Sequence, residues 1–199
     1  LGGLKRLFSA NLRYLAYNLK PLLVMIVPIF LLLAQMNLWF GYQVQQPGET
    51  LLLKVEFNQA VEVDRLDLEV EAPPGVLVDS PPVRIIDGKE VDWRLKIVEL
   101  RGGQLVIKNG GEKYAKDISL PQSKLARVSA IRVNQNIWEQ LLNPGEKPLP
   151  RDAEIKKIEV VYPSARLNLF GLKIHWLVAY FVLSIIFGFG LKGWFKVEI

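Results

Sequence analysis

The sequence predicts a membrane protein with two transmembrane helices that flank an all-β extracytoplasmic domain, either an immunoglobulin-like sandwich or a barrel. Two apolar stretches, residues 21–40 and 174–191, contain no Asp, Glu, Lys or Arg. A helix needs about 20 apolar residues to cross a hydrocarbon core about 30 Å thick, and each stretch is close to that length. The long segment between them alternates apolar and polar residues with a period of two, as half-buried strands do.

These signals divide the chain into five parts. We expect an amphipathic basic juxtamembrane helix at residues 1–20, a transmembrane helix at 21–40, the β domain at 41–170, a second transmembrane helix at 171–191 and a short cytoplasmic tail at 192–199. The first apolar stretch is longer than the apolar region of a usual signal peptide and lacks an A-x-A cleavage pattern. We therefore interpret it as a retained anchor.

Residues 1–20 carry a stripe of apolar side chains at helical spacing, with basic residues between them. Its members are Leu4, Leu7, Phe8, Leu12, Leu15 and Leu19. Such a helix either lies in the cytoplasmic membrane interface or forms the last turns of a longer helix that leads into the membrane. A partner-binding or coiled-coil segment is the alternative.

Charge is distributed unevenly along the chain. The formal net charge is +5, yet acidic and basic residues almost balance within residues 41–170. The basic excess flanks the two apolar stretches, at Lys5, Arg6, Arg13, Lys20, Lys173, Lys192 and Lys196. The positive-inside rule then predicts that both termini are cytoplasmic and that the β domain is extracytoplasmic. The absence of Cys and of Asn-x-Ser/Thr sequons fits a bacterial inner-membrane protein with a periplasmic domain.

Several residues at the ends of the spans are typical of the membrane interface, where aromatic and basic side chains meet the headgroups. The predicted anchors are Lys20, Trp39, Phe40, Tyr42, Lys173, His175, Trp176, Lys192 and Trp194. A second set interrupts the apolar surfaces and is a candidate for helix kinking or helix packing: Pro28, Gln35, Asn37, Ser184 and Gly188. For Gln35 and Asn37, hydration at the interface is the simpler interpretation.

Short strands separated by turn residues account for the central domain. About seven to nine strands in roughly 125 residues are typical of a sandwich or barrel of immunoglobulin size. The alternation is clearest around Trp93 and Leu95, which we predict as core residues together with Val160. The expected elements are strands at 51–57, 61–70, 76–78, 83–86, 91–97, 105–108, 114–118, 126–133 and 155–162 and a short helix at 136–142.

The composition of the central domain argues against an enzyme. It contains no His and no Cys, which excludes Ser-His-Asp and Cys-His triads and removes the usual zinc and copper ligands. The acidic run Asp64, Asp67, Glu69 and Glu71 alternates with apolar residues, so a solvated strand face explains it better than paired-carboxylate catalysis or calcium binding. We expect no cofactor and no metal, and the balanced charge argues against nucleic-acid binding.

Residues 11–42 resemble the entry to a core span in the Oxa1/YidC/EMC3 membrane-insertase superfamily. The resemblance is carried by Asn18-Leu19-Lys20-Pro21, by Met25 and Pro28, and by the run from Gln35 to Tyr42. It implies that the stripe in residues 1–20 ends a cytoplasmic coiled-coil hairpin and that the second span is the next core helix. The large extracytoplasmic domain is an insertion relative to minimal members of the superfamily, and neither span carries the basic groove residue of bacterial insertases.

Three functions remain open from the sequence. We favour a non-enzymatic membrane protein that presents a periplasmic β-sandwich as a binding or scaffolding module in an envelope complex. The expected partners are the lipid bilayer and other membrane or envelope proteins. A membrane-protein insertase or chaperone of the superfamily named above is the alternative, and a transmembrane sensor is the second alternative.

Overall fold

The structure, a computed structural model, describes residues 2–122, 126–134, 136–169 and 171–195. It begins with one long helix, α1 (Gly2–Phe40), which joins the predicted juxtamembrane helix to the first predicted span. The part Leu19–Phe40 has a mean hydropathy of 2.2 and is long enough to cross a membrane, and a signal sequence near an N-terminus shares these properties. Within the described part of the chain it is the one helix that meets this criterion of length and apolarity.

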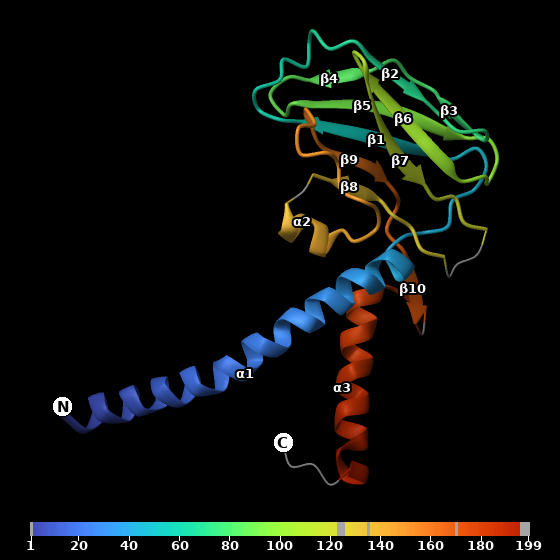
Figure 1. The fold of residues 1–199 in the computed structure, drawn as a ribbon. Coiled ribbons are helices and arrows are strands. Elements are labelled where there is room, and N and C mark those ends of the chain that lie inside the picture. Colours follow the sequence, from blue (N-terminus) through green and yellow to red (C-terminus); the bar gives the residue numbers. More distant parts are fainter. Residues whose placement is uncertain (1, 123–125, 135, 170, 196–199) are drawn as a thin grey trace.

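The central domain consists of two antiparallel sheets packed face to face (Figure 1). The larger sheet has the strand order β3-β5-β1-β9-β8, and β4 also pairs with β5. Its strands are β1 (Thr50–Phe57), β3 (Val76–Val78), β4 (Val83–Ile85), β5 (Glu90–Ile97), β8 (Ile131–Val133) and β9 (Ile155–Val161). The smaller sheet has the order β2-β6-β7, with β2 (Leu68–Glu71), β6 (Gly103–Asn109) and β7 (Glu112–Ile118). This architecture agrees with the predicted all-β sandwich.

The core lies between the two sheets and follows from the alternation in the sequence. On β1, every second side chain from Leu51 to Phe57 is buried, because successive side chains of a strand point to opposite faces. Leu53 lies opposite Trp93 of β5 and opposite Val160 of β9, so these three side chains form one row of the inner face. Full burial of each such side chain stabilises the fold by about 1.5–3 kcal/mol.

Two predicted strands are shorter than expected. Within residues 61–70 only Leu68–Val70 belong to a strand, and Val63 reaches the core from an irregular turn instead. Within residues 126–133 only β8 is a strand, because the backbone N–H of Val128 donates to the carbonyl of Leu38 in α1 at 2.8 Å. Apolar residues that reach a core from a loop produce the same sequence signal as a strand.

The end of the domain contains a hairpin that the sequence analysis missed. Strands β10 (Arg166–Leu169) and β11 (Leu172–His175) pair around a turn in which Gly171 has φ +86°, a value that favours glycine. The following helix, α3 (Trp176–Phe195), therefore starts later than the predicted second span. Its apolar part, Trp176–Leu191, is shorter than a typical membrane-spanning helix. Residues 196–199 of the predicted tail lie outside the described residues.

The two chain connections to the sandwich run side by side. The N–H of Gln43 donates to the carbonyl of Pro163 at 2.9 Å, and the N–H of Ala165 donates to the carbonyl of Gly41 at 2.8 Å. Consequently α1 and α3 leave the sandwich at the same end and then diverge (Figure 1). A short helix, α2 (Ile137–Leu142), follows β8 on this side of the domain.

Candidate functional site

The aromatic residues predicted as interface anchors take two different positions. Trp39 and Phe40 are exposed at the end of α1, whereas Trp176 is buried at the start of α3. The rings of Phe40 and Trp176 lie 6.4 Å apart, and the ring of Tyr42 lies 5.6 Å from that of Tyr162 in the sandwich. Tyr42 thus packs against the sandwich, and Trp176 packs against the end of α1, while Trp39 is exposed.

The other predicted anchors lie on the connecting elements. Lys20 is exposed on α1 and lies over the ring of Tyr17 at 5.5 Å, a cation–π contact. Lys173 and His175 belong to β11, and the His175 Nδ1 accepts from the N–H of Leu177 at 3.3 Å, at the first turn of α3. Lys192 and Trp194 fall within α3.

The candidate helix-packing residues do not meet one another. On α1, Pro28 and Gln35 are exposed and Asn37 is half-buried. On α3, the hydroxyl of Ser184 donates to the carbonyl of Tyr180 at 2.7 Å. A Cβ atom added at Gly188 would meet no atom within 4 Å. The surface around Ser184 and Gly188 is therefore open to a further helix or to lipid.

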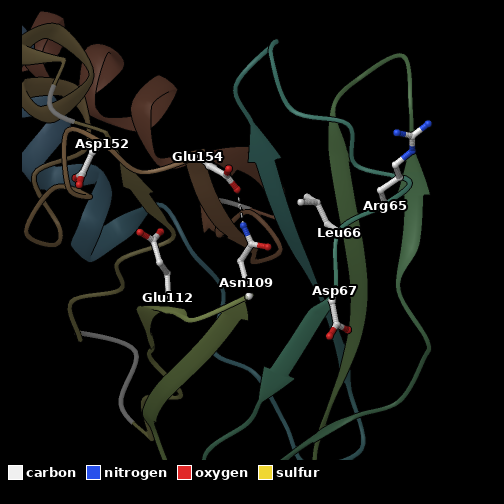
Figure 2. A pocket seen from close by; sticks show the side chains of 8 residues that line it. Arg65, Leu66, Asp67, Asn109, Glu112, Asp152 and Glu154 are labelled. Carbon is white, nitrogen blue, oxygen red and sulfur yellow. Dashed lines mark hydrogen bonds between the residues drawn. The ribbon is translucent and has the colours of Figure 1, made fainter.

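A hollow of the sandwich, with a volume of about 500 Å³, lies at the β6–β7 turn. Figure 2 shows Asn109 and Glu154 facing each other across it, joined by a hydrogen bond of 2.7 Å, while Arg65 points away and pairs with Glu62 instead. The hollow is lined by Arg65, Leu66, Asp67, Asn109, Gly110, Glu112, Asp152 and Glu154. Among the described residues no group of three or more His, Cys, Asp or Glu could hold a metal ion. The hollow has an acidic rim but no nucleophile paired with a base.

A buried ion pair links the smaller sheet to the loop after α2. The side chain of Lys116, on β7, is completely buried and pairs with Glu146. The same ammonium donates at 2.8 Å to the carbonyls of Ser129 and Asp117. Glu146 also accepts from the Ser129 hydroxyl at 2.6 Å and from the Asp117 N–H at 3.0 Å. Burial lowers the pKa of Lys116, and Glu146 opposes that shift.

This network holds the loop after α2 against the edge of the smaller sheet. Glu146 occupies the backbone N–H of Asp117 at the free edge of β7, so it covers part of an edge that is otherwise unpaired. The packing is close, since a Cβ atom added at Gly145 would lie 2.3 Å from the Ser129 hydroxyl oxygen. Sequence reasoning missed the pair, but a signal existed: Lys116 has the same strand phase as the buried residues Tyr114 and Ile118.

A cluster of charges lies on the outer face of the larger sheet. Lys54 on β1 pairs with Glu90 at 2.7 Å and lies 3.9 Å from Asp92, both on β5. The pKa of Asp92 is raised to about 6, mainly by burial. The negative charge of Glu90 also raises this pKa, and the ammonium of Lys54 lowers it by less. Among the described residues, Asp92 Oδ1 has no hydrogen-bond partner.

Beside these charges, the outermost strands of the larger sheet expose apolar side chains. β3 and β4 follow one another along β5, which makes them the edge of the sheet on the side away from α1 and α3 (Figure 1). We call this surface the distal edge; it consists of Leu77, Val83, Ile85 and Ile86, all exposed. Three of its members lie opposite charged residues of the outer face: Leu77 opposite Lys96, Val83 opposite Asp92 and Ile85 opposite Glu90.

Comparison with known proteins gives no relative from which a function could be inferred. No family model matches the chain, and neither the curated proteins nor the solved structures contain a match.

Proposed function

We propose that this chain is a non-enzymatic, membrane-anchored scaffold whose β-sandwich binds an extended segment of another envelope protein at the distal edge. In this account α1 and α3 both span the bacterial inner membrane, both termini are cytoplasmic and the sandwich is periplasmic. The observation that carries the proposal is the exposure of four apolar side chains along an unpaired sheet edge at the side of the domain away from the helices.

Two physical arguments support the distal edge as the binding surface. Exposed apolar side chains that lie together mark interaction sites, and Val83, Ile85 and Ile86 follow one another closely along the chain. An edge strand also offers unpaired N–H and C=O groups, to which an extended peptide can add as a further strand. Pro81 and Pro82 break this edge between β3 and β4, so backbone pairing is restricted to the two short strands and the apolar side chains add to the affinity.

The test combines Val83→Lys with Ile85→Lys in the full chain. Each new ammonium lies opposite a carboxylate on β5, so the fold tolerates it while the apolar surface is lost. The control is Val161→Lys, which places one such ammonium on an exposed valine of the outer face of β9. We expect the double variant, and not the control, to lose a crosslinked envelope partner that co-purifies with the native chain. Equal retention of that partner by both proteins would contradict the proposal.

A further inference from the structure

We propose that α2 is a third membrane contact, an interfacial helix that inserts its apolar face into the headgroup region of the bilayer. The proposal rests on the membrane anchorage of the proposed function and extends it. It concerns a surface on the opposite side of the sandwich from the distal edge (Figure 1).

The first observation is that α2 turns its apolar side outward, which is the opposite of a surface helix in water. Ile137 and Trp138 are each 72% exposed, and Leu141 and Leu142 are exposed as well. These four residues share one side of the helix because they occur at positions i, i+1, i+4 and i+5. A surface helix of a soluble domain turns its apolar side toward the core, whereas here that side faces outward.

The second observation is that the polar side of α2 faces the protein. Glu139 and Gln140 are half-buried, and the Gln140 amide donates to the carbonyl of Asn134 at 3.5 Å. Asn136 caps the helix, since its side chain accepts from the N–H of Trp138 at 3.0 Å. The cap and the half-buried polar side orient α2, so the outward direction of its apolar side is part of the fold.

The third observation is the position of α2. It follows β8, the last strand of the larger sheet on the side where the helices leave, and it lies against α1 (Figure 1). This contact leaves the apolar side of α2 exposed, next to the apolar segment Leu19–Phe40. A surface that adjoins a membrane-spanning helix at its extracytoplasmic end meets the outer leaflet first.

The chemistry of the side chains fits the headgroup region. Tryptophan is enriched at membrane–water interfaces, where its ring is apolar and its N–H reaches water. Interfacial helices bury their apolar side by about 5–10 Å at the boundary of headgroups and acyl chains. The lipid surface is therefore the occupant that we assign to α2. Its effect is to hold the sandwich in one orientation on the membrane, with the distal edge turned away from it.

The experiment uses single fluorescent labels on the full chain in nanodiscs. The printed sequence has no cysteine, so Leu142→Cys labelled with an environment-sensitive dye gives one reporter on α2. The matched control is Ile86→Cys on the distal edge, because Ile86 is 59% exposed and Leu142 is 56% exposed. A third reporter, Val27→Cys, lies within Leu19–Phe40 and reports on membrane anchorage itself. Lipids with a spin label near the headgroup or deep in the acyl chain serve as quenchers.

We expect the label at position 142 to show blue-shifted emission and to lose fluorescence with the shallow quencher. The label at position 86 should show neither effect. Position 27 should respond to the deep quencher. Quenching at position 27 without quenching at position 142 would overturn the role of α2 while the anchorage stands. No quenching at either position would overturn the anchorage as well. A second label, from Ile137→Cys, should show the same blue shift and the same quenching as position 142, since both belong to the same side of α2.

Discussion

Lys116 and Glu146 form a buried ion pair that joins the edge strand β7 to the loop after α2. The pair has hydrogen bonds on both sides, from the ammonium to two carbonyls and from the Ser129 hydroxyl and the Asp117 N–H to the carboxylate. Such complete pairing is what makes a buried charge tolerable, because taking an ion out of water costs several kcal/mol.

Glu146→Gln should destabilise the sandwich strongly, because it leaves the ammonium of Lys116 buried without its counter-charge. The expected loss in the free energy of unfolding is about 3–5 kcal/mol. Guanidinium unfolding in detergent, followed by the near-UV signal of the buried Trp93, measures it. The double variant Lys116→Met with Glu146→Gln should recover much of the loss. A single variant within 1 kcal/mol of the native chain would show that the pair is not a stabilising link, given the cost expected for an unpaired buried charge.

Asp92→Asn should change the pH dependence of stability. The pKa of Asp92 is raised to about 6 in the folded domain, from 3.8, so the folded state binds more protons than the unfolded state between these values. Stability from this group is therefore present at low pH and is lost as pH rises from about 4 to 6. The asparagine variant should lack this loss and be more stable above pH 6 by about 1–3 kcal/mol.

Thermal unfolding at pH 4.5 and 7.5 tests this prediction, with Asp79→Asn as the control, since Asp79 pairs with Arg94 on an exposed part of the same sheet. The control should not reproduce the gain in stability at pH 7.5, because Asp79 is exposed and its carboxylate is not buried by folding. Identical pH profiles for native and Asp92→Asn chains would show that Asp92 titrates at an ordinary pKa.

The proposed topology predicts which side of the membrane each segment faces. A membrane-impermeant maleimide added to intact bacterial spheroplasts should label Lys113→Cys, an exposed position on β7. It should not label Tyr17→Cys, an exposed position on α1 before the apolar part, until the membrane is permeabilised. The opposite pattern would place the sandwich in the cytoplasm.

The central strands were predicted well because the alternation of buried and exposed side chains is a property of each strand by itself. Leu53, Trp93 and Val160 each lie on strands whose alternation sets one face toward the core, and they meet as one row. The β10–β11 hairpin was not predicted, because it pairs within itself and buries little, so its alternation resembles a linker. The predicted start of the second span was too early, because the apolar residues of β11 directly precede α3 and lengthen the apolar stretch.

The candidate sites depend on contacts between distant parts of the chain, which no local pattern contains. The position of Lys116 in a buried strand phase was a usable signal, but its partner Glu146 lies 30 positions further along the chain, in a proline-rich loop. Likewise, residues 136–142 were predicted only as a short helix, and the structure is needed to show that its apolar side faces outward. The distal edge could be identified only once β3 and β4 were seen to be the outermost strands.

Photocrosslinking from single positions in living bacteria distinguishes a partner bound at the distal edge from a nascent chain at the apolar helix. A photoreactive amino acid at Ile86 samples the distal edge, and one at Val27 samples the apolar part of α1. A scaffold that binds at the distal edge should give a discrete envelope-protein adduct from position 86, and this adduct should disappear when Val83→Lys and Ile85→Lys are added. Adducts to ribosome-bound nascent chains from position 27, with none from position 86, would contradict the scaffold and favour the insertase.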